Sequence, residues 1–545
     1  MISYFSFVQF VRCILANLSR APAGVGSTKN DLRSGFLVFL IALPLCLGIS
    51  IASGFPPVAG ILSAIIGGVL VSFLGSARLT IKGPAAGLIV IAVGAVQELG
   101  QGDPVLGYRR ALAVGVLAAL VQIALALLRA ATMGTVMSPS VVHGMLAAIG
   151  VIIMSKQVHT VLGVVPEARE PIELLLEIPH SISRANPEVS LLGAAGLVLL
   201  FIWPNLRFKW AKVVPAPLVV LAITVPMGLY FHVSQAHDYQ FMGHHYHLGP
   251  EYLVRLPSSL LSAVVFPDFS VVWSGTSLKY VMMFALVGTI ESTLSVIAVD
   301  SMDPNKSVSD LNRDLRAAGI GNLVSALIGG LPMISEIVRS KANLDSGAKS
   351  HYANFYHGLF LLVFVALIPG ALQEIPLAAL AAMLVYTGAR LASPAEFLHA
   401  KKVGLDQLLL FVTTLVLTLA TDLLVGVAGG MALKFVLHWS RGVSPRSFFS
   451  PKISTCREGD VFVVKVNNAA ILTNVLTLRR SLEAVDDSIR EVRVEFENVA
   501  LVDHTFLLRL QAISQEWTRA KLTLVGLENM QALSNHEYAA RKSVQ

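Results

Sequence analysis

The sequence has little charge for its length. Of its 545 residues, 14% are Asp, Glu, Lys or Arg, whereas 54% are hydrophobic. A soluble domain normally carries about 25% charged residues, and a soluble protein this apolar could not cover its surface with polar groups. The composition therefore excludes an ordinary soluble protein and predicts a polytopic α-helical membrane protein in contact with a lipid bilayer.

Cysteine is also scarce. Cys13, Cys46 and Cys456 lie in different regions, and their spacing matches neither a metal site nor a disulfide framework. No nucleophile–base pair or other catalytic motif is evident, so we expect neither an enzyme nor a catalytic residue, and no bound metal or organic cofactor.

The charge is unevenly distributed. Residues 451–545 hold 24 of the 75 charged side chains, so an apolar body is followed by a polar tail. The net charge of +7 does not indicate a nucleic-acid partner, because the excess Lys and Arg lie in short loops between apolar runs. We divide the chain into an N-terminal cytoplasmic or interfacial segment (1–34), a transmembrane domain (35–440), a linker (441–450) and a soluble domain (451–545).

Long apolar runs follow one another through the body. Many could cross about 30 Å of hydrocarbon at 1.5 Å per residue. They are Gly35–Ala52, Pro57–Gly75, Ala111–Leu128, Val141–Met154, Val189–Trp203, Val213–Phe231, Leu278–Val299, Ala317–Gly330, Phe355–Ala371, Ile375–Leu391, Leu408–Ala420 and Leu423–His438.

Two further runs, Ala85–Val96 and Met333–Val338, are shorter and follow Gly/Pro breaks. Each takes the third position in its half of the chain. Short, interrupted segments at matching positions point to broken helices in an inverted repeat; the alternative is a pair of weak helices kinked by proline. The matching order favours about 14 segments in two inverted repeats of seven.

An even number of spans puts both termini on one side of the membrane. Basic loops containing Lys401, Lys402, Arg441 and Arg446 then lie inside, with Arg109 and Arg110 as exceptions. We expect a multi-pass protein of a bacterial-type inner membrane, with both termini cytoplasmic. The stretch Met1–Arg20 has no clear signal-peptide core and is interpreted as an interfacial helix.

The spacing of hydrophobic residues changes in the tail, residues 451–545. Val461–Val466, Val492–Phe496 and Leu522–Val525 have the pattern of strands, and Leu472–Ala484 and Phe506–Ala520 have helical spacing. This alternation predicts a small cytoplasmic α/β domain.

The two broken helices are the first candidate site. A helix that starts within the membrane directs free N–H groups and a partial positive charge into the gap, which suits an anion. Arg339 adds a full charge, although it could instead snorkel or pair structurally. The candidate substrate-binding residues are Gly83, Pro84, Ala85, Ala86, Ser335, Glu336, Ile337 and Arg339.

Glu291 is the second candidate, with Ser295 one turn later on the same helical face. A carboxylate in an apolar segment is a functional hypothesis by default. It could carry H⁺, ligate Na⁺, or form a structural salt bridge with Arg339. Glu336 would repel an anion, and we predict that it fixes Arg339 through an i, i+3 contact.

The His-rich loop and Asp310 have ordinary explanations. The outer loop with His232, His237, Asp238, His244, His245 and His247 could bind Zn²⁺, but a solvated loop is the preferred interpretation. Asp310 is expected to cap the following helix.

Several motifs resemble the SulP anion transporters, the family that includes prestin. The resemblance covers nearly the whole chain, and the tail resembles a STAS domain. The motifs are Gly75-Ser76 through Gly83-Pro84-Ala85-Ala86 in the third segment, Val141–Gly150 in the fifth, Val214-Pro215-Ala216-Pro217 in the seventh, Asn312–Leu315 and Gly319–Asn322 near the ninth, and Gly329–Pro332, Arg339-Ser340 and Ser346–Lys349 in the tenth.

The resemblance implies a core-and-gate fold, an anion held between the third and tenth segments, elevator-like access and a homodimer. Glu291 falls at the eighth-segment carboxylate position, where bicarbonate/Na⁺ symporters have aspartate and relatives described as proton-coupled or as exchangers have glutamate. Ser295 falls where the symporters have a threonine ligand.

Three departures from the family pattern stand out. Leu45 replaces a polar residue of the first segment. The run Ser335-Glu336-Ile337 replaces a Gly-Ala-Thr-like run, which weakens the case for Na⁺ ligation there. In the tail, Asp503-His504-Thr505-Phe506 lacks the usual phosphorylatable serine, so we expect a structural or docking role.

We therefore expect a secondary active transporter of a small inorganic oxyanion, bicarbonate or sulfate, coupled to H⁺ or Na⁺ through Glu291. The alternatives are a C4-dicarboxylate transporter of the same family, an uncoupled anion exchanger or channel, and a receptor that signals through the tail. A coupling carboxylate favours the carrier, because a channel needs none.

Overall fold

A computed structural model describes residues 25–543 except 132–136, 169, 208–213, 258–261, 306, 450–451, 484, 486–488 and 517–520. The chain forms two compact units, Met1–Thr135 with Ile149–Arg390 and Val136–Ala148 with Leu391–Gln545. The interfacial helix predicted over Met1–Arg20 lies outside the described residues.

Eight helical segments of the described chain are long and apolar enough to cross a membrane. They are α2 (Val25–Ala52), α3 (Pro57–Ile66) continued through η1 (Gly67–Val71) and α4 (Ser72–Leu74), α6 (Pro104–Leu127), α7 (Pro139–Val161), α9 (Pro187–Ile202) with η4 (Trp203–Asn205), α11 (Gly275–Met302), α16 (Leu377–Leu391) with α17 (Pro394–Val403), and α19 (Leu423–Ser440).

Six shorter helical segments complete the pattern. They are η2 (Ala86–Leu88) with α5 (Ile89–Gly100), α10 (Ala216–Tyr230), α12 (Leu311–Leu327), α13 (Ile337–Asp345), α14 (Tyr352–Leu367) and α18 (Leu405–Ala420). In chain order the fourteen segments form two sets of seven, and in each set the third segment is a short helix preceded by a strand. The predicted fold class is confirmed.

Some elements differ from the sequence expectation. Helix α2 begins at Val25, upstream of Gly35. An additional helix, α8 (Pro171–Ser183), precedes α9, and its Leu176 side chain is 77% exposed. A short helix, α15 (Pro369–Gln373), follows α14.

Helix α2 is packed tightly against its neighbours in the first unit. Its Cys46 and Leu47 side chains are fully buried in a cluster that includes Ala379 of α16. A methyl group at Gly60 of α3 would overlap the carbonyl oxygen of Cys46, and the Gly60 amide donates to Ser50 Oγ at 2.7 Å. Small residues that allow such close approach are typical of membrane helix interfaces.

The third segment of each half starts as a strand because its sequence disfavours a helix. In β1 (Ile81–Pro84), proline restricts the residue before it to extended conformations. In β4 (Met333–Glu336), the strand follows Gly329, at φ +98°, and Pro332. The strands pair antiparallel, with Lys82 opposite Ser335. The ladder satisfies backbone groups that a broken helix would leave unpaired in a membrane.

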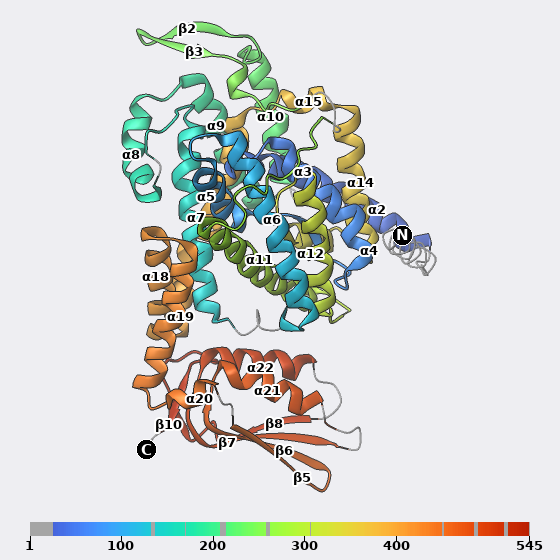
Figure 1. Ribbon diagram of the computed structural model, residues 1–545, viewed down its shortest axis with the longest axis vertical. Helices are drawn as coiled ribbons and strands as arrows, with labels where there is room; N and C mark the ends of the chain where they lie inside the picture. The colour runs from blue at the N-terminus through green and yellow to red at the C-terminus, as the bar shows by residue number, and fades with distance from the viewer. Residues whose placement is uncertain are drawn as a thin grey trace. The chain divides into compact units, whose positions relative to one another are not determined.

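The second unit contains the C-terminal α/β domain. Its sheet has the order β5 (Lys452–Glu458), β6 (Val461–Ala470), β7 (Glu491–Val502), β10 (Arg541–Ser543) and β9 (Met530–Ala532), and β8 (Lys521–Val525) also pairs with β7. Strands β6, β7 and β8 are parallel. Helices α21 (Leu472–Glu483) and α22 (His504–Glu516) lie together on one face of the sheet (Figure 1).

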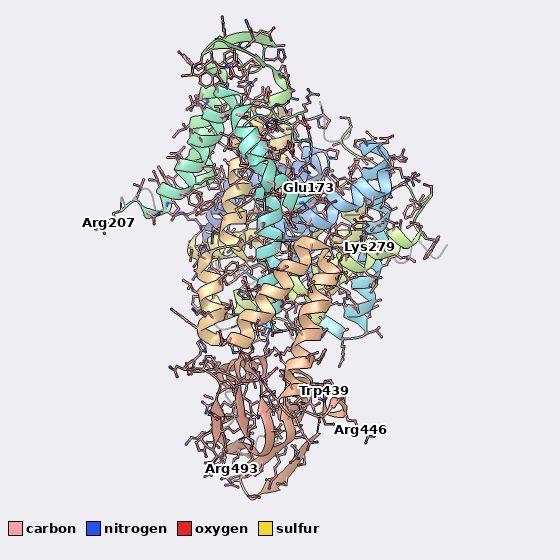
Figure 2. The ribbon with its side chains drawn as sticks, turned by 90° about the vertical axis from the view of Figure 1, so that its left-hand side faces the viewer. Glu173, Arg207, Lys279, Trp439, Arg446 and Arg493 are labelled. Atoms are coloured by element: carbon pink, nitrogen blue, oxygen red, sulfur yellow. The ribbon has the colours of Figure 1, made fainter. Side chains whose placement is uncertain are left out.

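The sequence predicts the three parallel strands and both helices of this domain. It misses β5 and β9, at the two ends of the strand order, and β10, which lies between β7 and β9. Figure 2 shows Trp439 at the end of α19, from which the chain enters the domain, and Arg446 on the short helix α20 (Pro445–Phe449).

A buried ion pair attaches this domain to the last membrane helix. Lys434 of α19 lies 2.9 Å from Asp503 Oδ2 and donates a hydrogen bond to Thr505 Oγ1 at 2.8 Å. The Lys434 and Asp503 side chains are 4% and 3% exposed. Asp503 also accepts from the Phe506 amide at the start of α22, at 2.6 Å. The Asp503–Thr505 stretch thus docks onto α19.

Replacing Asp503 with Ala is expected to loosen the start of α22, because it leaves the Lys434 ammonium buried without an anion. Breaking a buried pair costs about 3 kcal/mol, which corresponds to a roughly hundredfold larger opening equilibrium. Hydrogen exchange of the Phe506 amide and its neighbours in the full-length protein measures this change. As a control, Lys465→Met removes the partly exposed pair with Glu495, in which the Lys465 side chain is 48% exposed, and is expected to cost less than about 1 kcal/mol.

The difference in hydrogen exchange between wild type and Asp503→Ala should disappear in acid. Burial tends to raise the pKa of Asp503, but Lys434, His438 and the Phe506 amide outweigh it and hold the pKa below its ordinary value. A depressed carboxyl pKa contributes stability that is present above the unfolded pKa and lost as pH falls through the folded pKa. Equal exchange in wild type and Asp503→Ala at neutral pH would contradict the docking role.

Candidate functional site

The β1–β4 ladder has two faces, because side chains alternate along a strand. Lys82 and Ser335, which oppose each other, project to one face. Gly83 and Glu336, at neighbouring positions of the register, belong to the other. The ladder thus joins the starts of η2–α5 and α13, and the sequence correctly predicts that these two segments meet.

The first face holds a buried ion pair that the sequence analysis missed. Lys82 Nζ lies 2.5 Å from Asp314 Oδ2 of α12 and 2.5 Å from Ser335 Oγ, and both charged side chains are 2% exposed. The Ser335 amide donates to Ser292 Oγ of α11 at 3.3 Å. One signal was available in the sequence, since Lys82 is an ionisable residue placed directly before Gly83-Pro84 in an apolar region.

A second polar contact fixes the backbone of β4. The Met333 amide donates to Asn322 Oδ1 at 2.6 Å, and Asn322 Nδ2 donates to the Met333 carbonyl at 3.1 Å. Asn322 Nδ2 also donates to Gln122 Oε1 of α6 at 2.8 Å. Strand β4 is therefore held by side chains from α12 as well as by β1.

Arg339 lies at the other face. Its side chain is 1% exposed, and its Nη1 is 3.5 Å from Cys46 Sγ of α2. A methyl group at Gly83 would overlap Nη1, so the guanidinium lies directly against β1. Among the described residues, Nε and Nη2 have no hydrogen-bond partner. A buried guanidinium with free donors is suited to bind an anion.

Glu291 lies at the start of the third segment. Its side chain is buried in α11, and its carboxylate contacts Gly87 so closely that a methyl group there would overlap Oε1. Gly87 belongs to η2, whose N-terminus carries partial positive charge. Oε1 has no hydrogen-bond partner among the described residues. The carboxylate of Glu291 therefore lies against η2, directly after Ala85 and Ala86, which the sequence assigned to substrate.

The structural alternatives for these carboxylates are not supported. In the described part of the chain, no ion pair joins Glu291 to Arg339 or Glu336 to Arg339, and Glu336 Oε1 is buried without a partner. The predicted i, i+3 contact is wrong because it requires both residues in one helix. Glu336 instead ends β4, with φ −96° and ψ 119°.

The other predicted residues differ in how they contribute. Helix α13 begins at Ile337, so Ser335 is a strand residue that contacts Lys82, and the Ile337 side chain is 42% exposed. Pro84 ends β1, and Ala85 and Ala86 follow at the start of η2. Ser295 is buried in α11 one turn after Glu291. The structure thus brings Gly83 and Arg339 together, with Glu291 at Gly87.

Replacing Gly87 with Ala is expected to displace the Glu291 carboxylate. The added methyl has no room, and such overpacking typically costs about 1–3 kcal/mol. Thermal unfolding of the purified protein measures the loss. Gly370→Ala is the control, because a methyl there meets nothing within 4 Å. The loss should shrink in a Glu291→Ala background; an equal loss with and without the Glu291 side chain would contradict the contact.

The His-rich loop is a hairpin, β2 (His237–Phe241) and β3 (His244–Leu248). His247 Nδ1 lies 2.8 Å from Asp238 Oδ1 and its Nε2 lies 3.5 Å from Glu251 Oε1. The hydrogen bond with Asp238 raises the pKa of His247 above its ordinary value. Within the described residues no group of three or more His, Cys, Asp or Glu side chains could hold a metal ion.

Elsewhere, Asp310 caps α12 as predicted.

Comparison with known proteins gives the class of this fold. Residues 28–414 match the model of the sulfate permease family. The match covers more than half of the chain, and the chain belongs to that family. It is thus a multi-pass membrane protein of an anion-transporter family.

Particular relatives narrow the comparison. The bicarbonate transporter BicA of Picosynechococcus is 24% identical over 79% of this chain and 73% of its own length. The sodium-independent sulfate anion transporter of Bos taurus is 24% identical over 92% of this chain and 84% of its own.

Solved structures share the fold. The transmembrane domain of a cyanobacterial bicarbonate transporter BicA superposes with a TM-score of 0.62 at 25% identity, over 73% of this chain and 97% of that one. The murine Solute Carrier 26 family member A9 anion transporter, in the inward-facing state, has a TM-score of 0.66 at 15% identity, over 95% of this chain and 88% of that one. The second likeness includes the C-terminal domain, as expected for STAS.

Proposed function

We propose that this chain is a secondary active transporter of a small inorganic oxyanion, sulfate or bicarbonate, that works by elevator-like alternating access. The observation that carries the proposal is the buried guanidinium of Arg339, whose Nη1 lies against Gly83 and whose Nε and Nη2 have no hydrogen-bond partner among the described residues. The names of the relatives, which specify bicarbonate or sulfate, support the same class of substrate.

The charges around the β1–β4 ladder suggest how a second ion is coupled. Lys82 and Asp314 neutralise each other. Glu336 lies within the electrostatic field of Arg339, although no ion pair joins the two side chains in the described part of the chain, whereas no described cationic side chain acts on Glu291. An ionised Glu291 lies against Gly87 of η2, close to the positive end of this helix, and repels an anion there. The anion site therefore becomes available when Glu291 is neutralised, either by H⁺ or by a bound cation such as Na⁺.

Uptake into liposomes containing the purified full-length protein tests the proposal. Labelled bicarbonate, sulfate and succinate are supplied with imposed H⁺ or Na⁺ gradients. We expect saturable accumulation of one oxyanion that depends on a gradient. Accumulation of succinate alone would identify a C4-dicarboxylate carrier. Flux that neither saturates nor responds to a gradient would overturn the proposal in favour of a channel.

The orientation and assembly of the protein are part of the proposal. The basic loops support cytoplasmic termini in a bacterial-type inner membrane. A homodimer is proposed from the family resemblance of the C-terminal domain. Protease access to that domain in inside-out and right-side-out vesicles tests the orientation.

A further inference from the structure

We propose that Asp314, Ser335 and Ser292 form a cation site that the Lys82 ammonium occupies permanently, so that transport requires no Na⁺. This inference rests on the proposed function and narrows its coupling ion. It starts from the cradle of oxygen atoms around Lys82. A carboxylate and a hydroxyl oxygen lie 2.5 Å from Nζ, and Ser292 Oγ is 3.3 Å from Ser335 Oγ.

These oxygens come from three elements of the first unit, α12, β4 and α11. Carboxylate and hydroxyl oxygens are the ligands that hard cations take. The Asp314 carboxylate is buried, and a buried carboxylate in a membrane segment needs a positive partner. Lys82 supplies a compact positive charge, covalently attached to the chain.

The backbone of Lys82 is fixed, so the ammonium cannot readily leave the cradle. Its amide donates to Asn354 Oδ1 of α14 at 3.3 Å. A methyl at Gly67 of η1 would lie 2.8 Å from the Lys82 carbonyl oxygen, so η1 packs directly against the Lys82 backbone. The same Asn354 donates to the Gly67 carbonyl at 3.0 Å, which closes the strand against η1.

A solution cation would therefore have to displace a tethered one that already neutralises Asp314. With Asp314 balanced internally and Glu336 within the field of Arg339, Glu291 is the carboxylate best placed to respond to a second ion. Among the described residues its buried carboxylate oxygen Oε1 has no hydrogen-bond partner, and the carboxylate can take up a proton without a coordination shell. The geometry thus favours H⁺ over Na⁺ as the coupling ion.

The test combines transport with a measurement that needs no substrate. Uptake of sulfate and bicarbonate into liposomes is compared in Na⁺ and in N-methylglucamine at fixed pH. A coupled cation would change the rate by roughly fivefold or more, whereas we expect a change below about twofold for wild type. Thermal unfolding of the purified protein is then measured over a Na⁺ titration, where ligand binding to the folded state raises the melting temperature.

Lys82→Ala should unfold at a lower temperature than wild type, and Na⁺ should recover part of the loss by filling the vacated cradle. The double variant Lys82→Ala/Asp314→Ala should show no Na⁺ response. Lys341→Ala, which removes an exposed pair with Asp345, is the matched control. Should Lys82→Ala not fold, the wild-type titration decides.

A Na⁺-dependent rise in wild-type melting temperature or uptake would overturn the inference. So would a folded Lys82→Ala that is indifferent to Na⁺. If wild type transports neither anion but Lys82→Ala alone responds to Na⁺, the cation site stands and the proposed function fails.

Discussion

Replacing Arg339 with Met is expected to abolish saturable anion uptake and to leave the protein folded. The guanidinium is 1% exposed, and its Nε and Nη2 have no partner in the described part of the chain. A substrate oxyanion would supply the missing acceptors. Two hydrogen bonds to a charged group contribute about 3 kcal/mol or more, so affinity should fall at least roughly hundredfold.

The sign of the stability change distinguishes binding from structure. A structural Arg339 would be paired, and its loss would destabilise the empty protein by several kcal/mol. An unpaired buried guanidinium already costs free energy, so Met, which is apolar and of similar length, should leave the melting temperature unchanged or raise it. The rise in melting temperature on adding the transported anion should disappear at the same time.

Two companion variants sharpen this test. Arg339→Lys keeps the positive charge but loses the planar guanidinium that can form two parallel hydrogen bonds. Saturable uptake should therefore be present in Arg339→Lys, but with weaker affinity than in wild type. Lys341→Met on the same helix removes an exposed cation and should transport normally. Unchanged affinity in Arg339→Met, or strong destabilisation without substrate, would show that the charge is structural.

The sequence predicts those parts of the site that depend on local chemistry. Gly83-Pro84 and Gly329–Pro332 mark where regular helix is disfavoured, and their matching order predicts that two broken segments belong together. Glu291 stands out because an isolated carboxylate in an apolar run has no ordinary explanation. The same reasoning places Asp310 at a helix start, where the structure finds it.

The predictions that were wrong or missing depend on contacts between residues that are distant in the sequence. The β1–β4 register shifts the start of the tenth-segment helix to Ile337, and this shift removes Glu336 from the helix geometry assumed for Arg339. The pairing of Lys82 with Asp314 joins residues 232 positions apart. The role of Lys434 was missed for the same reason, because its partner Asp503 is 69 positions away in the C-terminal α/β domain.

Replacing Glu291 with Gln is expected to abolish gradient-driven accumulation while preserving downhill anion flux. Gln has nearly the same shape and is always neutral, so it mimics protonated Glu291 beside Gly87. The positive end of η2 is then permanently available to the anion. Coupling energies are typically 1–3 kcal/mol, or about 5–150-fold in affinity, and this dependence of anion affinity on the proton should vanish.

The measurement is uptake into liposomes over a range of external pH, with and without an imposed pH gradient. In wild type, lowering the external pH should increase anion affinity, because protonation of Glu291 removes the competing negative charge. In Glu291→Gln, affinity should be independent of pH and the internal anion should only reach equilibrium with the outside.

Glu98→Gln is the matched control for this variant. Glu98 lies near the end of α5, is about half exposed and contacts Lys279 and Tyr280. Its loss removes one carboxylate from the same segment without touching the start of η2, so coupling should persist. If Glu291→Gln still accumulates anion against its gradient, the coupling proton is carried elsewhere, and Glu336 is then the remaining buried carboxylate beside the Arg339 face of the ladder.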